Sequence, residues 1–359
     1  MVEVSSENTI KQRVAVGLSG GVDSSVAALL LKNEGYEVVG VYMQCWDIKE
    51  EGCAADEDKA YAVQTAAKLG IKFEALDFRE AYKQRVIQYF FDEYSKGRTP
   101  NPDVMCNKEI KFGIFFDWAM EHGFDFISTG HYARVNKTGA GYELLKGIDT
   151  GKDQSYFLYR LGQEQLSKTL FPVGGFKKPQ IRELAKENML PAYKRPESMG
   201  ICFIGEVDIK NFLEQRIEHK NGNVLNTQGE IIGEHDGVWF LTIGQRHGFK
   251  VNKYTGVPLY VVNKDAEKNE VVVGVYEEAL RNQFVVTDYS WILNDPFGDN
   301  NELACDVRIR HLGKMNNVTL TKVGDTINVK LENSIFGVAS GQSAVFYIDD
   351  LTLGGGIIL

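Results

Sequence analysis

The sequence predicts an α/β protein, in which a doubly wound parallel sheet is followed by a small central domain and a C-terminal β-barrel. Three observations favour this class. Short apolar segments alternate with helical patterns in the first half, a glycine-rich turn follows the first apolar segment, and short alternating segments fill the last part. At 359 residues the chain is too long for one ordinary core, and we expect domains at residues 1–206, 207–275 and 276–359.

The first strand and the turn behind it organise the N-terminal domain. The apolar run at 14–18 suits a buried strand, and the sequence SGGVDS at 19–24 follows where a strand would turn and a helix would begin. That helix is expected to stop at Gly35. Glycines without a Cβ let backbone N–H groups approach phosphate oxygens, and the positive end of the helix dipole favours the same anion. The segment therefore predicts a phosphate-binding turn.

The remaining elements of this domain alternate between strand and helix. Strands are predicted at 37–42, 72–77 and 125–129, and helices at 58–69, from the third strand to Tyr94, and at 110–122. The segment 96–108 contains two prolines and is predicted to be a loop. Ligands of such sheets bind at the carboxyl ends of the strands, where the phosphate-binding turn and residues 129–131 would both lie.

Composition and charge limit the class of protein. No apolar run approaches the length that crosses a bilayer, and residues 1–13 lack the apolar part of a secretory signal, so we expect a cytoplasmic protein. The net charge of −9 argues mildly against a nucleic acid partner, although a local basic strip could still bind one. Five cysteines do not form a disulfide framework, so those that matter are expected to be reactive thiols or metal ligands.

Two cysteines lie in segments that could carry chemistry. Asp103 and Cys106 are three residues apart, so one turn would bring a carboxylate beside a thiol, although an Asx turn with a small buried residue explains the same pattern. Cys202 stands between apolar residues, where a cysteine is most often structural. Cys45 and Cys53 have acidic neighbours, but they are far apart and histidine is missing, so we predict no metal there.

The sequence predicts β structure in the second half of the chain. Residues 222–274 are rich in glycine and β-branched residues, and strands are predicted at 303–309, 326–331 and 344–348. Strand alternation would place Arg308 and Arg310 on one face of the barrel. This face is either a modest basic strip that binds nucleic acid or an ordinary solvated surface.

Five motifs occur in one order along the chain: SGGVDS, NPDVMCN at 101–107, GHYAR at 130–134, KDQSYFL at 152–158 and GICFIG at 200–205. The first resembles the pyrophosphate-binding loop of the N-type ATP pyrophosphatases, Rossmann-like enzymes that cleave ATP between the α and β phosphates and pass AMP to a carbonyl oxygen. Together the five resemble the bacterial tRNA-specific 2-thiouridylases, which exchange the 2-oxygen of the wobble uridine for sulfur. The resemblance covers almost the whole chain.

The resemblance implies a role for each motif. Residues that would bind ATP are Gly17, Leu18, Ser19, Gly20, Gly21, Val22, Asp23, Ser24, Met43 and Gly130. Magnesium is expected with ATP, and Asp23 is the one residue to which we could assign it. Cys202 would accept a persulfide sulfur, Cys106 would release it by forming a disulfide with Cys202 or assist as a nucleophile, and Asp103 would act as acid or base beside them.

The resemblance also implies partners. Residues that would contact tRNA are Asn101, Pro102, Asp103, His131, Lys152, Asp153, Gln154, Arg310, His311 and Gln342. The expected substrates are the tRNAs that accept lysine, glutamate and glutamine, and the expected sulfur source is a persulfide-donating relay protein or a cysteine desulfurase.

Two rival functions remain open. An adenylating, amide-forming ligase could be built on the same loop, and it would need no paired thiols. A non-catalytic module could bind ATP and RNA without releasing pyrophosphate. The thiolation chemistry accounts for more of the chain, because a uracil carbonyl is a poor electrophile until adenylation supplies a leaving group, and release of a persulfide sulfur needs a second thiol within reach.

Overall fold

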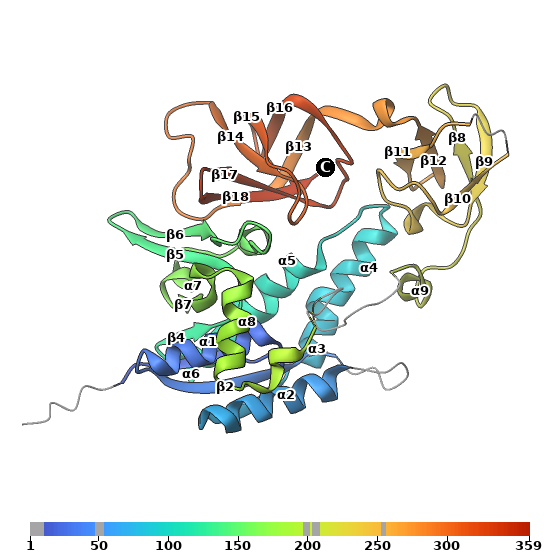
Figure 1. Cartoon of the computed structure of the whole chain (residues 1–359). Helices are drawn as coiled ribbons and strands as arrows, with labels where there is room; N and C mark the ends of the chain where they lie inside the picture. Colours follow the sequence, from blue (N-terminus) through green and yellow to red (C-terminus); the bar gives the residue numbers. More distant parts are fainter. Residues whose placement is uncertain (1–10, 47–53, 197–201, 203–208, 253–255) are drawn as a thin grey trace, which may run out of the picture.

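The computed structural model describes residues 11–46, 54–196, 202, 209–252 and 256–359 (Figure 1). A parallel-sheet domain carries the N-terminal half, the barrel packs beside it, and the central domain lies to one side of both. The predicted class, a doubly wound sheet followed by a central domain and a barrel, is confirmed. Among the described residues, no helix combines the length and the apolar character needed to cross a bilayer.

The first sheet has five strands in the order β3-β2-β1-β4-β7, and every neighbouring pair is parallel. The strands are β1 Arg13–Gly17, β2 Glu37–Gln44, β3 Lys72–Asp77, β4 Phe126–Ser128 and β7 Thr169–Leu170. Successive residues of β1 belong to different cores, because Val14 and Val16 pack into one apolar cluster and Ala15 into the other. Both faces of the sheet are therefore covered, as a parallel sheet requires.

Helices cover the two faces of this sheet. They are α1 Val22–Asn33, α2 Ala54–Leu69, α3 Arg79–Tyr82, α4 Gln88–Ser95, α5 Pro102–Cys106, α6 Phe115–Glu121, α7 Gln163–Ser167 and α8 Lys178–Glu187. A π-helical stretch, Lys83–Ile87, joins α3 to α4, and a second one, Asn107–Ile114, joins α5 to α6. A further helix, α9 Ile209–Glu214, follows towards the central domain.

The prediction of a loop over residues 96–108 is wrong in its second half. A helix begins at Pro102 and runs through the π-helical stretch to Glu121. Proline is tolerated there because the first helical residue has no intrahelical N–H bond to lose. The Asn101 side chain caps the helix by accepting a hydrogen bond of 3.2 Å from the Val104 N–H. Asp103 therefore lies on the first turn of a helix, and Cys106 one turn later.

The central domain is a five-stranded sheet in the order β10-β9-β8-β12-β11. Its strands are β8 Gly222–Leu225, β9 Ile231–His235, β10 Phe249–Val251, β11 Tyr260–Asp265 and β12 Glu270–Gly274. Valines from three strands, Val224, Val261 and Val271, are fully buried together in a core of its own.

The C-terminal domain is a closed antiparallel barrel in the order β13-β16-β15-β14-β17-β18, with β18 paired back to β13. Its strands are β13 Leu280–Trp291, β14 Glu302–Arg308, β15 Asn316–Val323, β16 Thr326–Phe336, β17 Ser343–Ile348 and β18 Leu351–Ile358. A hairpin from the first domain, β5 Ala133–Thr138 and β6 Gly141–Lys146, pairs with β18 and extends the barrel sheet. This hairpin, which the sequence did not predict, ties the two domains together (Figure 1).

The predicted basic strip is also wrong. Strand β14 ends at Arg308, so alternation does not carry over to Arg310. Arg308 is only 7% exposed and turns inward to a carboxylate, Asp153, with 2.7 Å between Nη1 and Oδ2. The barrel therefore uses this arginine to contact the first domain.

Candidate functional site

The glycine turn lies at the carboxyl end of β1. Gly20 has a φ of +77°, and a Cβ there would lie 2.3 Å from the Asp58 carbonyl oxygen of α2, so only glycine fits. Gly21 is the N-cap of α1 and provides no side-chain cap. The first N–H groups of α1 therefore face an open turn, and Ser24 Oγ accepts a hydrogen bond of 3.2 Å from the Ser19 N–H across it. This is the geometry of an anion-binding helix start.

The loop behind β4 closes one side of this turn. A Cβ on Gly130 would lie 2.6 Å from the Ser24 nitrogen, so the two backbones are in direct contact. Met43 closes another side, since its Cε would be 3.0 Å from a Cβ on Gly17. Gly17, Met43 and Gly130, which the sequence assigned to nucleotide binding, thus surround one turn.

Asp23, in the first turn of α1, is held by two side chains. The Lys178 ammonium lies 2.7 and 2.8 Å from its two carboxylate oxygens, and the Tyr132 hydroxyl donates a hydrogen bond of 2.7 Å. A magnesium ion at Asp23 would have to share the carboxylate with Lys178 or displace this lysine. The Lys178 side chain is one-tenth exposed and places a positive charge beside the phosphate-binding turn.

The second constellation brings together cysteines 96 positions apart in the sequence. The Cys106 and Cys202 thiols are hydrogen-bonded to each other. Asp103 fixes Cys202 by accepting a hydrogen bond of 2.9 Å from its N–H, and Tyr82 donates one of 2.7 Å to its carbonyl oxygen. In this structure the four described cysteines, Cys45, Cys106, Cys202 and Cys305, are free thiols. A carboxylate and two thiols therefore converge beside α5.

The pKa values of the two thiols are shifted in opposite directions. A hydrogen bond from Cys106, opposed by burial and aided by the Lys111 ammonium, lowers the pKa of Cys202 to about 7. Burial, with the hydrogen bond to Cys202 and its negative charge, raises the pKa of Cys106 well above its usual value. Burial also raises the pKa of Asp103, against the Cys202 N–H and Lys111. Cys202 is thus the nucleophile of the pair near neutral pH, and Cys106 keeps its proton.

A third thiol, Cys45, lies beside this pair at the end of β2. It is 2% exposed, and burial together with the charge of Cys202 raises its pKa, so it is unreactive as it stands. Cys53 and its acidic neighbours Asp47, Glu50 and Glu51 lie outside the described residues. Among the residues that are described, no group of three His, Cys, Asp or Glu side chains is placed to hold a metal ion.

The residues predicted to contact tRNA fall into two groups. One lies where the barrel meets the start of α5: Gln342 Nε2 donates to the carbonyl oxygens of Thr99 and Pro100 at 2.9 and 3.1 Å. Arg310 donates to the Gly337 carbonyl at 2.9 Å. His311 lies 4.3 Å from Phe157 between ring centroids, and burial lowers its pKa to about 4. Asn101 and Pro102 begin α5 at this junction.

In the other group, Asp153 and His131 are buried and Gln154 is half-buried. Asp153 is 1% exposed and pairs with Arg308, while Gln154 accepts a hydrogen bond of 3.0 Å from the Tyr132 N–H. His131 is 7% exposed, and its Nδ1 lies 2.7 Å from Thr129 Oγ1. The structure therefore brings Asn101, Pro102, Arg310, His311 and Gln342 together with the dithiol helix, but places Asp153 and His131 inside the protein.

Comparisons with known proteins agree along the whole chain. Family models match in order, described as tRNA methyl transferase HUP domain at residues 12–206, tRNA methyl transferase PRC-barrel domain at 210–275, and aminomethyltransferase beta-barrel domain at 281–358. The tRNA-specific 2-thiouridylase MnmA of Bacillus licheniformis is 45% identical over 352 residues, which are 96% of this chain and 94% of that protein. The chain belongs to the family of tRNA-specific 2-thiouridylases.

Other relatives are similar in extent. The 2-thiouridylase of Bacillus subtilis is 43% identical over the same 96% of this chain and 94% of its own. Among solved structures, the U34-tRNA thiolase NcsA from Methanococcus maripaludis is 20% identical with a TM-score of 0.36, and the match covers 57% of this chain and 63% of that one.

Sequence analysis did not predict three cations at the site of this 2-thiouridylase family member, namely Lys178, Arg195 and Lys111. Lys178 has a signal that could have revealed it, because a lysine in the first turn of a helix opposes the helix dipole and therefore implies a specific anionic partner. Arg195 donates a hydrogen bond of 3.2 Å to the Gly20 carbonyl and pairs with Asp58 at 2.5 Å. Lys111 joins the dithiol because of the π-helical stretch, for which the sequence gives no sign.

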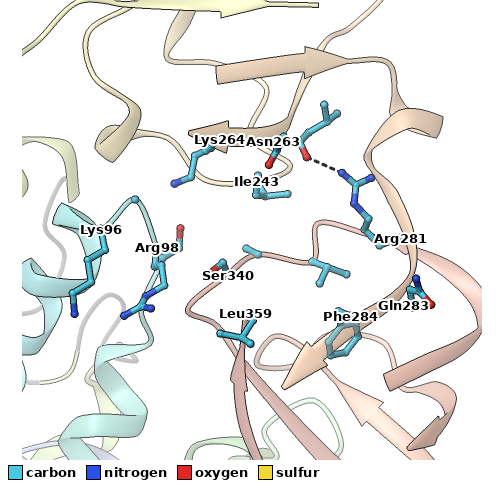
Figure 2. A pocket seen from close by; sticks show the side chains of 15 residues that line it. Lys96, Arg98, Ile243, Asn263, Lys264, Arg281, Gln283, Phe284, Ser340 and Leu359 are labelled. Carbon is cyan, nitrogen blue, oxygen red and sulfur yellow. Dashed lines mark hydrogen bonds between the residues drawn. The ribbon is translucent and has the colours of Figure 1, made fainter. Parts of the chain in front are cut away.

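A cavity of about 350 Å³ lies where the three domains meet (Figure 2). Cationic side chains that line it are Lys96, Arg98, Lys264 and Arg281. Arg98 is paired with Glu93, and Arg281 donates a hydrogen bond of 2.8 Å to the Val262 carbonyl, drawn as the dashed line in Figure 2. Lys264 donates a hydrogen bond to the Leu241 carbonyl of its own domain, so Arg281 is the cation of these four that is seen to bond across a domain boundary of the 2-thiouridylase fold.

Proposed function

We propose that this protein uses ATP to activate the 2-carbonyl of the wobble uridine, position 34, of tRNA and replaces that oxygen with a persulfide sulfur carried on Cys202. The products are 2-thiouridine, AMP and pyrophosphate. The observation that supports this most directly is the hydrogen-bonded pair Cys106 and Cys202 beside Asp103. An amide-forming ligase on the same turn would have no use for such a pair.

The glycine turn fits the phosphates of ATP. Its uncapped N–H groups at the start of α1 would bind phosphate oxygens, and Gly130 leaves room because it has no side chain. Lys178, already oriented by Asp23, would add positive charge where the leaving pyrophosphate gains negative charge. Magnesium is expected with ATP, and Asp23 would be its protein ligand only after exchange with Lys178.

The dithiol residues divide the sulfur chemistry between them. Cys202, whose pKa is lowered to about 7, would accept the sulfur and present it to the activated carbon. Cys106 would then attack Cys202 and free the transferred sulfur, as thiol–disulfide exchange requires. Asp103 would accept the proton that Cys106 gives up, since both side chains lie at the start of one helix.

The proposed partners are those that the resemblance to the family implies. The substrates would be the tRNAs for lysine, glutamate and glutamine, and the sulfur would come from a persulfide-donating relay protein or a cysteine desulfurase. Asn101, Pro102, Arg310, His311 and Gln342 would guide the anticodon to the start of α5. Gln342 bonds to the segment directly before this helix, and Asn101, Arg310 and His311 all lie near Tyr156. Lys152, at the start of the KDQSYFL motif, would add a cation to this group, since its charge helps to lower the pKa of His311.

The test incubates the protein with ATP, a persulfide source and unmodified tRNA, and analyses the digested nucleosides for 2-thiouridine. We expect 2-thiouridine together with pyrophosphate, and none from Cys202→Ser. An arm with S-adenosylmethionine in place of the sulfur source examines methyl transfer, which the family models' description names. Full activity of Cys106→Ala would favour the ligase, and binding of ATP and tRNA without pyrophosphate release would favour the non-catalytic module.

A further inference from the structure

Lys111 is the only described cation for which the structure records contacts with both reactive sulfurs. Its ammonium is hydrogen-bonded to Cys202 and lies within electrostatic range of Cys106 and Asp103. Burial favours the neutral amine, but Cys202, Cys106 and Asp103 outweigh it and raise the pKa of Lys111 above its usual value. The lysine is therefore a charged group inside an apolar cluster, a position that is costly unless an anion is present.

The π-helical stretch explains why this lysine reaches the sulfurs. In a regular α-helix, residues three and four apart share a face, and Lys111 is five residues after Cys106. In Asn107–Ile114 the hydrogen bonds run from i to i+5, as the Phe115 N–H bonded to the Ile110 carbonyl shows at its end. The wider turn brings Lys111 onto the face that carries Asp103 and Cys106. Such stretches are frequent at functional sites.

We propose that Lys111 is the shared counter-ion of the two sulfurs, stabilising negative charge on Cys202 before sulfur is loaded and on Cys106 afterwards. The inference rests on the proposed thiolation and names the group that orders its two sulfur steps. Several titratable and charged groups face the dithiol from the elements packed around it. They are Asp103 of α5, Lys111 of the π-helical stretch, Cys45 directly after β2, Tyr82 of α3 and, beyond Lys111, His131. Lys111 is the single cation of this set, because burial and Lys111 itself keep His131 neutral by lowering its pKa.

The loading step uses the charge on Cys202. The Cys202 thiolate attacks the outer sulfur of a persulfide R–S–S–H, the S–S bond of the donor breaks, and the donor leaves as R–S⁻. Cys202 then carries Cys–S–S–H, and the negative charge has left with the donor. Its Sγ no longer needs Lys111.

The release step needs a charge on Cys106. Burial is the largest cause that raises the pKa of Cys106 and Cys202 is the next, and the effect of the Cys202 charge is removed once Cys202 is uncharged. The ammonium of Lys111 is then available to Cys106, whose proton passes to Asp103. The Cys106 thiolate attacks Cys202 Sγ, a Cys106–Cys202 bond forms, and the outer sulfur leaves with the electron pair, either as hydrosulfide or within 2-thiouridine. A dithiol reductant returns both cysteines to thiols.

The first experiment measures Cys202 alone, without tRNA or ATP. Alkylation by iodoacetamide is followed against pH, with the modified peptide identified by mass spectrometry. Lys111→Met should slow alkylation at neutral pH by about 5- to 50-fold and move the midpoint upward, because the thiolate fraction falls as the pKa returns towards that of a free thiol. Lys111→Arg should restore the profile. Lys108→Met is the matched control, since Lys108 lies in the same π-helical stretch, is 44% exposed and pairs with Glu109.

The second experiment measures Cys106, which is fully buried, by the ultraviolet absorbance of its thiolate. Replacement of Cys202 by alanine imitates the loss of its charge. The absorbance of Cys106→Ala/Cys202→Ala, which lacks both thiols, is subtracted from that of Cys202→Ala, so that the difference reports Cys106. The Cys106 midpoint should fall in Cys202→Ala and rise again when Lys111→Met is added. Two results would overturn the proposal: a pH profile of Cys202 alkylation that is unchanged in Lys111→Met, or a Cys106 midpoint that changes neither in Cys202→Ala nor when Lys111→Met is added. Because neither assay involves thiolation, those results would leave the proposed function standing.

Discussion

Asp153 is the residue for which the sequence and the structure suggest different roles, and its replacement by alanine separates them. Asp153 Oδ2 lies 2.7 Å from Arg308 Nη1, and its carboxylate also accepts hydrogen bonds from the Gly147 and Ser155 N–H groups, both at 3.1 Å. Arg308 belongs to β14 of the barrel, and Asp153 to the first domain. The carboxylate therefore joins two domains from inside the protein.

The size of the effect follows from burial. Both side chains are less than a tenth exposed, and Arg308 Nε is buried without a hydrogen-bond partner among the described residues. Asp153→Ala would leave this guanidinium buried and uncompensated, which costs about 3 to 5 kcal/mol. For a protein of this size the thermal midpoint should fall by roughly 4 to 9 °C. Asp153→Leu combined with Arg308→Met should recover most of the loss, because it removes both charges together.

Thermal unfolding followed by circular dichroism measures this, with tRNA affinity measured below the midpoint. The matched control is Asp350→Ala, which breaks a pair of 2.7 Å with Arg134 that also joins the two domains but is 62% exposed at Asp350. That change should cost less than about 1 kcal/mol. A variant Asp153→Ala that keeps the wild-type midpoint while losing tRNA affinity would refute the reasoning, and would support the direct tRNA contact that the KDQSYFL motif predicts.

Three further predictions concern the two halves of the site. Gly130→Ala would put a Cβ 2.6 Å from the Ser24 nitrogen, so we expect the KM for ATP to rise roughly tenfold to a hundredfold in a pyrophosphate-release assay, whereas Gly139→Ala, with nothing within 4 Å, should leave it unchanged. Alkylation of Cys202 should increase with pH and reach half its maximum near pH 7, because a lowered pKa populates the thiolate above that value; a midpoint near that of free cysteine would contradict the hydrogen-bonded pair. Lys178→Met should slow pyrophosphate release by about tenfold or more without changing the alkylation of Cys202, and equal losses in both assays would indicate misfolding instead.

The parts of this protein that local sequence predicts are those set by neighbours in the chain. The apolar run at 14–18 with glycines behind it predicted a strand, a turn and a helix, because periodicity and glycine conformation act over a few residues. The spacing of Asp103 and Cys106 allowed either a carboxylate beside a thiol or an Asx turn with a small buried residue, and the structure places both residues on one helix. The two prolines at 100 and 102 misled the prediction, since proline forbids a helix interior but suits its first residue.

What the sequence could not predict depends on contacts between distant segments. Only the fold brings Cys202 to Cys106, and the resemblance to a family, not the spacing, suggested that they meet. Arg308 was assigned to the surface because strand alternation says which residues share a face, but not which face a neighbouring domain will cover. Lys111 was missed because a π-helical stretch changes the helical period without a recognisable residue pattern.

The segment 129–131 connects the two halves of the site. Gly130 touches the start of α1 at the phosphate-binding turn, while the next residue, His131, packs its ring 5.9 Å from Phe112 in the π-helical stretch that carries Lys111. A backbone shift at the turn would therefore reach the helix of the dithiol through one peptide unit. Burial and Lys111 both lower the pKa of His131, so its ring is neutral. The contact between the turn and the dithiol helix therefore depends on packing. Such packing holds activation of the base and delivery of sulfur in one fixed relation, as a reaction between two positioned groups requires.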